Sequence, residues 1–156
     1  MAKPIVLFIE LKIASKNKYV CDIAEKLFQN KITVNIYAEE KNCTQLDNLL
    51  WTWKQESFIP HIISDRTQQP NGHVIISSSS ENLVATQAVI LLDPLPPEVL
   101  QNYSLIIDFA EIYHSDRKIA SRQRFKIMRD SQNFDIHFTQ LGAFLSKKSI
   151  DLSRSF

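Results

Sequence analysis

The chain has 156 residues, of which 44% are hydrophobic and 22% charged, and its formal net charge is +1. These values are typical of one globular domain with a core, and they argue against a disordered or fibrous chain. A net charge so close to zero gives no general indication of nucleic-acid binding. The longest apolar runs, at 5–9 and 88–92, are too short to cross a bilayer, and the first residues lack the apolar stretch of a signal peptide.

The N-terminal half alternates between strand and helix patterns. A buried strand is predicted at 4–11, an amphipathic helix at 17–30, a second strand at 32–38 and a second helix at 44–53. The segment 57–65 contains a proline, so it is predicted to be a loop or an edge segment of the sheet.

The C-terminal half continues the alternation. Strands are predicted at 73–77, 87–93, 104–111 and 134–141, one helical turn within 94–102 and a last helix at 113–130. This order predicts an α/β fold with a mainly parallel sheet between two layers of helices, a three-layer sandwich. Residues 1–142 are expected to form the single domain, and residues 143–156 a flexible C-terminal tail.

The two cysteines, Cys21 and Cys43, are too few for a disulfide framework. Each has apolar neighbours in a helical pattern, so both are expected to be buried free thiols. Free thiols fit a reducing cytoplasm, and we therefore expect a cytoplasmic protein without membrane contact.

Residues that would carry catalytic or cofactor chemistry are few. A phosphate-binding loop needs glycines after a strand, and the two glycines, Gly72 and Gly142, lie outside such turns. The four histidines have no metal-ligand spacing. Asp108 and Glu111 could form an acid/base pair, but charged residues at a strand end are more often structural. The sequence therefore predicts no cofactor, no metal and no catalytic residue, and it argues against an enzyme.

One segment gathers the positive charge of the chain. Residues 117–129 carry six cations and no acid, which leaves −5 on the rest of the chain. On a helical wheel with about 100° per residue, four cations fall within roughly 80° of one another, with Phe125 at the edge of their arc. These four cations are Lys118, Arg122, Lys126 and Arg129.

The rest of this predicted helix divides into two groups. Ile119, Ala120 and Ile127 form an apolar arc that is expected to face the core. Arg117 and Arg124 point away from the cation arc, and Arg124 is expected to matter least for binding at that arc.

Three interpretations of the cation arc remain open at this point. A solvated helix face is the structural one, although such faces usually alternate in charge. Phosphates of a single-stranded nucleic acid would suit cations spread along a groove. A short acidic peptide with one hydrophobic anchor would suit a compact cluster beside an aromatic ring, and Phe125 between Arg122 and Lys126 favours this interpretation slightly.

Several motifs in fixed order resemble one family. They are LDNLLW (46–51) followed by SFIPH (57–61), CDIAEKL (21–27), IIDF (106–109), RQRFKIMR (122–129) and NFDI (133–136). In order and spacing this set resembles the chi subunit of bacterial DNA polymerase III holoenzyme, over roughly residues 1–140.

The resemblance implies a non-catalytic accessory subunit of a DNA-directed DNA polymerase, active in DNA replication. The family has a Rossmann-like parallel sheet without a phosphate-binding loop. Its members pair with the psi subunit, which tethers them to the clamp loader, and bind the acidic C-terminal tail of single-stranded DNA-binding protein, which ends in phenylalanine. The implied location is the bacterial cytoplasm, at the nucleoid through the replisome.

The resemblance also assigns a peptide-binding site. Its residues in this sequence are Lys118, Arg122, Phe125, Lys126 and Arg129, with Ala110 as a pocket wall for the peptide's phenylalanine. An arginine there can bind the terminal carboxylate with two hydrogen bonds. Phe125 stands where the family often has tyrosine, so the stacking surface is kept and a hydroxyl is lost.

A second patch is associated with psi. The resemblance places Trp51, Phe58, Pro60 and His61 there, and Pro60 favours an extended segment that displays Phe58. The competing interpretation is that Trp51 and Phe58 are core residues. A helicase-like repair protein is a further candidate partner for the Phe58 surface.

Two other functions stay as alternatives. One is direct binding of single-stranded nucleic acid through the 117–129 helix, whereas the family resemblance implies no direct DNA contact. The other is a nucleotide-dependent enzyme on a Rossmann-like sheet, which the missing phosphate loop disfavours.

Overall fold

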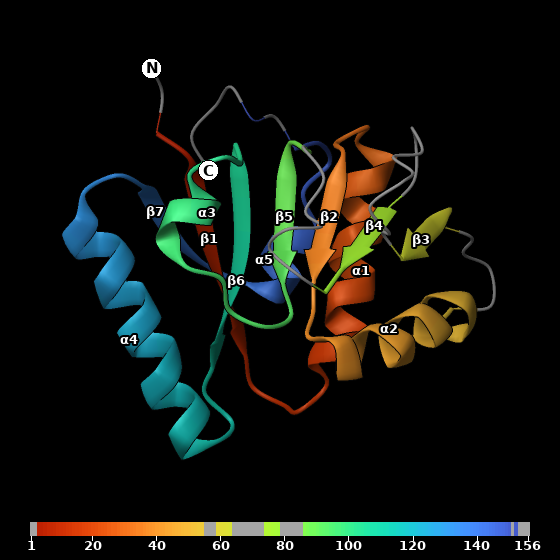
Figure 1. The fold of residues 1–156 in the computed structure, drawn as a ribbon, viewed down its shortest axis with the longest axis horizontal. Helices are drawn as coiled ribbons and strands as arrows, with labels where there is room; N and C mark the ends of the chain where they lie inside the picture. The colour runs from red at the N-terminus through yellow and green to blue at the C-terminus, as the bar shows by residue number, and fades with distance from the viewer. Residues whose placement is uncertain (1–2, 55–58, 64–73, 79–85, 151, 153–156) are drawn as a thin grey trace.

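The computed structural model describes residues 3–54, 59–63, 74–78, 86–150 and 152, and their arrangement is drawn in Figure 1. The strands are β1 (Ile5–Leu11), β2 (Val34–Tyr37), β3 (His61–Ile63), β4 (Val74–Ser77), β5 (Ala88–Leu91), β6 (Leu105–Glu111) and β7 (Asp135–Gln140). The helices are α1 (Lys16–Gln29), α2 (Glu40–Thr52), α3 (Pro97–Leu100), α4 (Ser115–Ser131) and α5 (Leu141–Leu145).

The described strands form one sheet of seven strands in the order β3-β4-β2-β5-β6-β1-β7. Every neighbouring pair in this sheet is parallel. The predicted parallel α/β fold is therefore confirmed, and the proline-containing segment supplies the edge strand β3. At the other edge lies β7, beside β1 (Figure 1).

Strands β1, β5 and β6 contribute to two separate cores because successive side chains point to opposite faces of a sheet. In β1, Leu7 packs with α1, α2 and α5, whereas Phe8 packs with α3 and α4. The first core is the larger, and it includes both cysteines, which are buried and free as predicted. Burial raises the pKa of both thiols.

Two helices differ from the prediction. Helix α2 begins at Glu40, four residues before the predicted start, and α5 was not predicted at all. The short sequence LGAFL of α5 directly follows a strand, and a run of that length does not distinguish the two states.

The C-terminal segment packs against the first core. Phe144 is fully buried and Ile150 is 8% exposed, and both belong to the core that contains α1. The Ile150 N–H donates to Asn30 Oδ1 at 3.1 Å, and Lys26 Nζ donates to the Lys147 carbonyl oxygen. The domain boundary at residue 142 stays a prediction, while the packed part of the chain reaches at least Ile150.

The strand order reverses between β6 and β1: from β1 the chain continues toward one edge of the sheet, and from β6 it continues toward the other. They are neighbours in register, with Glu111 opposite Leu11 at their carboxyl ends. The helices that follow them, α4 and α1, cover opposite faces. In open α/β sheets, ligands commonly bind at the carboxyl ends of strands at such a point. No helix among the described residues is long and apolar enough to cross a membrane.

Candidate peptide-binding site

The basic segment forms α4, as predicted. Asp116 in its first turn and Arg129 in its last turn both have the charge that the helix dipole favours. The helix ends at Gln132, whose φ of 60° is left-handed and whose N–H donates to the Arg129 carbonyl oxygen. The four cations of the arc are all at least partly exposed, so each could contact a partner.

A pocket of about 290 Å³ lies between α4 and the carboxyl ends of the strands beneath it. Its volume is at the lower end of those that hold a small ligand or a single side chain. Its lining residues are Phe8, Ala110, Ile112, Lys118, Ser121, Arg122, Phe125 and Phe138. The structure therefore brings four of the six predicted peptide-binding residues together around one mostly apolar pocket, namely Ala110, Lys118, Arg122 and Phe125.

Phe125 joins the pocket to the second core. Its ring meets that of Phe8 edge to face, with centroids 5.4 Å apart and an interplanar angle of 72°. Ala110 is 8% exposed, so its methyl group lies at the inner wall of the pocket rather than at the surface. The aromatic surface expected of Phe125 is thus present and fixed by a neighbouring ring.

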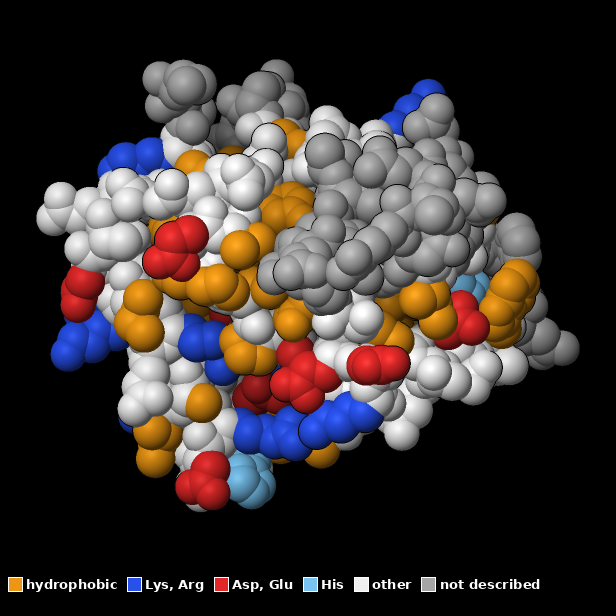
Figure 2. All heavy atoms as spheres, in the orientation of Figure 1, with side chains coloured by type: hydrophobic (Ala, Val, Ile, Leu, Met, Phe, Trp, Pro, Cys, Tyr) orange, Lys and Arg blue, Asp and Glu red, His pale blue; other side chains and the backbone are white. Residues whose placement is uncertain are grey.

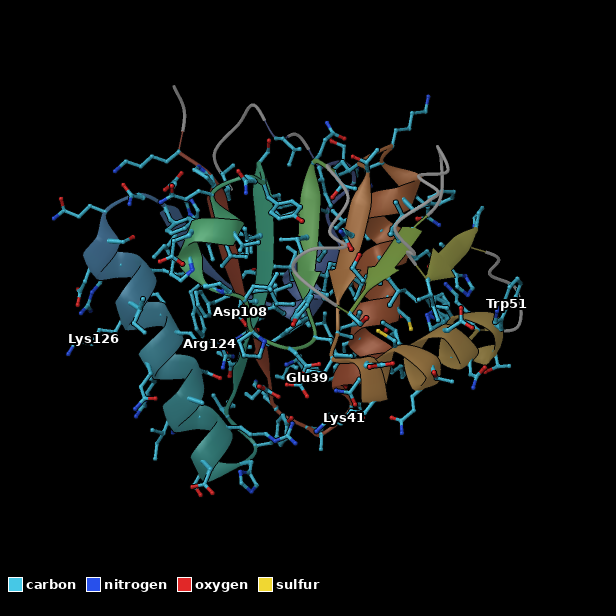
Figure 3. The ribbon with its side chains drawn as sticks, viewed as in Figure 1. Glu39, Lys41, Trp51, Asp108, Arg124 and Lys126 are labelled. Atoms are coloured by element: carbon cyan, nitrogen blue, oxygen red, sulfur yellow. The ribbon has the colours of Figure 1, made fainter. Side chains whose placement is uncertain are left out.

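Lys126 and Arg129 lie farther along α4 and do not line the pocket. Lys126 points outward from the helix (Figure 3). The Arg129 guanidinium lies 6.0 Å from the Phe125 ring centroid, within cation–π range, and its Nε is 3.3 Å from Asp130 Oδ1. These two cations extend the positive face beyond the pocket.

The predicted apolar arc of α4 does not face the core. Ile119 is 54% exposed and Ile127 is 57% exposed, and apolar atoms are visible on the outer surface over α4 (Figure 2). The buried residues of α4 are Ser121 and Met128, on the opposite side of Phe125 from the cation arc. The wheel therefore placed the cations correctly relative to Phe125 but assigned the buried side wrongly.

Arg124 points away from the cation arc, as expected, and toward the sheet (Figure 3). Its Nε and Nη2 donate to the two carboxylate oxygens of Asp108 at 3.0 and 3.2 Å. Asp108 is 1% exposed, so this is a buried ion pair with bidentate geometry. At this position a charged residue of α4 faces the sheet, because the buried Asp108 carboxylate binds it.

The carboxyl ends of β6 and β1 hold a cluster of opposite charges where a Rossmann-like sheet would bind a nucleotide. The Glu111 carboxylate accepts hydrogen bonds from Tyr113 at 2.9 Å and Arg117 at 3.3 Å, and Lys16 Nζ lies 3.5 Å from it. Burial lowers the pKa of Lys16, and the Glu111 carboxylate opposes that shift. Asp108 and Glu111 are both paired with cations, which fits structural ion pairs better than an acid/base pair. Among the described residues, no three potential ligands cluster as a metal site would require.

The sequence prediction missed four residues of the pocket, namely Phe8, Ile112, Ser121 and Phe138. Ile112 and Phe138 are exposed apolar residues, at 39% and 58%, and they form the outer wall. Phe138 lies directly opposite Phe8 in the β1–β7 register. The alternating pattern of β7 signalled that Phe138 shares a face with Ile136, but the pairing of β7 with β1 cannot be inferred from that pattern.

The second predicted surface lies at the other end of the molecule, where α2 meets β3 (Figure 3). Trp51 is 56% exposed, which excludes a core role for it, and its ring centroid is 4.7 Å from that of His61. His61 is 7% exposed, its Nδ1 is 2.7 Å from the Ile59 carbonyl oxygen, and its Nε2 lies 3.3 Å from Asp47 Oδ1 without hydrogen-bond geometry. Pro60 is partly exposed, and Phe58 lies outside the described residues.

The fold and the chemistry of its strand ends define a Rossmann-like α/β protein without a glycine-rich phosphate loop. The family model of the DNA polymerase III chi subunit, HolC, matches residues 4–135. The chain belongs to this family, and its role is that of an accessory subunit in DNA replication.

A solved structure of the S. cerevisiae Dbp5 C-terminal domain, bound to Gle1 and IP6, has a similar fold. The TM-score is 0.52 and the identity 12%, and the match covers 94% of this chain and 100% of that one. This likeness concerns the fold alone. No curated protein matched the chain.

Proposed function

We propose that this chain is a non-catalytic subunit that binds two partners at opposite ends of the molecule. The pocket beside α4 binds the acidic C-terminal tail of single-stranded DNA-binding protein. The α2–β3 end binds the psi subunit and, through it, the clamp loader. The observation that carries the proposal is the pocket itself, in which an apolar interior meets Lys118 and Arg122. With these partners, the protein would act in the bacterial cytoplasm, at the nucleoid through the replisome.

The chemistry of the pocket fits a peptide that ends in phenylalanine. The terminal ring would lie against Phe8, Ala110 and Phe125, where apolar surface is removed from water. The terminal carboxylate would then lie at the pocket mouth, where Arg122 can donate two hydrogen bonds to it. Acidic side chains upstream would be attracted by Lys118.

Direct binding of single-stranded DNA is less well supported by the same geometry. Nonspecific DNA binding uses cations along an extended groove together with aromatic platforms for stacking. Here Lys118 and Arg122 lie at the rim of a pocket, and the Phe125 ring packs edge to face on Phe8 inside it. We therefore keep the proposal that DNA is reached through the partner and not directly.

The test is a titration of the protein into a fluorescent acidic peptide that ends in phenylalanine, followed by anisotropy. Amidation of the peptide's terminal carboxylate should lower the affinity by about tenfold, because a charge-assisted pair with Arg122 is lost. The internal charges of the peptide are the same in both forms, so the comparison isolates the terminus. Equal affinities for the two peptides would reject a carboxylate site, and tight binding of single-stranded DNA at physiological salt would favour the alternative.

The α2–β3 end has features of a protein interface, because a large aromatic side chain is exposed there and packs against a buried residue. Trp51 lies over the buried His61 ring, whose Nδ1 is 2.7 Å from the Ile59 carbonyl oxygen. Ile63 on the edge strand β3 is 43% exposed. Exposed tryptophan beside apolar surface is the composition expected at the centre of an interface. A helicase-like repair protein would be a competitor for this same end.

Replacement of Trp51 by alanine should weaken psi binding by about 30-fold, since a central tryptophan typically contributes about 2 kcal/mol. Isothermal titration with purified psi would measure it. The matched control is Ile127→Ala, which removes a side chain of similar exposure from the outer side of α4. The proposal of two separate surfaces would be contradicted if the two variants lost the same affinity for psi. It would also be contradicted if Trp51→Ala lost peptide binding.

A further inference from the structure

The inner side of α4 is attached to the sheet by the apolar side chains of Phe125 and Met128 and by polar side chains. Its buried residues are Ser121 and Met128, and Arg124 lies between them on the same side. The larger apolar residues Ile119 and Ile127 are more than half exposed, so they contribute little to this attachment. With only two apolar residues packed on the sheet, α4 depends on its hydrogen bonds as well for its position.

Arg124 ties α4 to β6 on one side of Ala110. Besides its two bonds to Asp108, its Nη2 donates to the Phe109 carbonyl oxygen at 3.2 Å. The Arg124 side chain is 19% exposed and that of Asp108 is 2% exposed. Bidentate charge-assisted pairs fix orientation as well as distance, so this pair fixes where α4 lies along the strand.

Ser121 ties α4 to β6 on the other side of Ala110. The Glu111 N–H donates to Ser121 Oγ at 3.1 Å, and that hydroxyl donates to the Arg117 carbonyl oxygen at 2.8 Å. Arg124 Nη2 lies 3.5 Å from Ser121 Oγ, so the two ties are in contact with each other. The backbone groups on both sides of the pocket wall residue Ala110 are thus bonded to α4.

We propose that Arg124, supported by Ser121, is a positioning residue of the peptide site. It holds the Ala110 wall on β6 at a fixed distance from Arg122 and Phe125 on α4, and this inference rests on the proposed peptide-binding function. Arg124 is not among the residues that line the pocket, and its charge is matched by Asp108. Its effect therefore passes through the position of α4. A pocket that is already formed loses less entropy when a peptide binds.

The test uses the full chain with Arg124→Met, Arg124→Lys and the control Arg117→Met, titrated with the acidic peptide ending in phenylalanine at several salt concentrations. Arg124→Met should lower the affinity about tenfold and Arg124→Lys about threefold, while the control stays near wild type. Arg117 is a matched arginine on the same helix that pairs with Glu111 at the far side of the cluster. At high salt, where long-range attraction of the peptide is screened, Arg124→Met should keep its loss of affinity, because that loss comes from the position of α4. A loss that disappears at high salt would indicate an effect of charge on the peptide and overturn the proposal.

A second measurement follows the hydrogen bond between the Glu111 N–H and Ser121 Oγ in the free protein. Amide hydrogen exchange at Glu111, whose N–H is bonded to Ser121 Oγ, should become faster in Arg124→Met than in the control. If Arg124→Met does not fold, Arg124→Lys keeps a cation beside Asp108 and should give the same two effects to a smaller extent. Unchanged peptide affinity in a folded Arg124 variant would overturn this inference while the wild-type affinity upholds the proposed function. Absence of peptide binding in the wild type would reject the proposed function itself, and with it the role assigned to Arg124.

Discussion

Replacement of Arg122 by alanine should weaken binding of the acidic, phenylalanine-terminated peptide by about 30-fold, or about 2 kcal/mol. Arg122 is the arginine at the pocket mouth, and the apolar interior fixes where the peptide's terminal carboxylate must lie. A carboxylate held there loses part of its hydration, and without the guanidinium nothing of opposite charge replaces that hydration at the same place. Fluorescence anisotropy with the labelled peptide measures the change, and psi binding should be unaffected.

The control for Arg122→Ala must separate a local contact from a general loss of positive charge. Lys41→Ala also removes one cation, from an exposed position on α2 that is far from the pocket (Figure 3). Long-range attraction of an acidic peptide would fall similarly in both variants and would disappear at high salt. The assignment of Arg122 fails if the two variants lose affinity equally.

The cation arc could be predicted from the sequence, whereas the buried side of α4 could not. Helical spacing alone places Lys118, Arg122 and Phe125 on adjoining parts of the helix, and the pocket contains all three. The helical pattern predicts buried isoleucines, because apolar residues usually face a core. Here the sheet presents buried Asp108 to the helix, so an arginine faces inward. Which side of α4 is buried therefore depends on a residue of another element, Asp108 on β6. The periodicity within one helix contains no information about that residue.

The pocket as a whole depends on strand order for the same reason. Phe8, Ala110 and Phe138 come from three strands that are far apart in the chain, and β1 brings them together by pairing with both β6 and β7. Strand patterns gave each strand and its alternating sides, but they carry no information on which strands become neighbours. Ala110 was placed near the cations by the family resemblance, and the geometry of β6 explains why the two meet.

Replacement of Asp108 by alanine should destabilise the fold by about 3 kcal/mol. The variant leaves the Arg124 guanidinium in a mostly buried position without its carboxylate, and the Phe109 N–H loses its acceptor, Asp108 Oδ1, at 2.7 Å. Removal of one member of a buried pair costs more than the pair contributes, because the remaining charge is not hydrated. Urea unfolding followed by circular dichroism measures the loss, and an unchanged m-value would show that the unfolded state is the same.

Two further variants decide whether this cost comes from the unpaired charge. The double variant Asp108→Ala with Arg124→Met removes both charges, and it should recover a large part of the lost stability, since no buried charge is left unpaired. Asp130→Ala is the surface control on the same helix, because Asp130 and Arg129 form a pair 3.3 Å apart in which both side chains are 58% exposed. An exposed pair of this kind contributes less than about 1 kcal/mol. If the double variant is no more stable than Asp108→Ala, the cost comes from the cavity and the unbonded Phe109 N–H. The Asp108–Arg124 pair would then stabilise the position of α4 less than its geometry indicates.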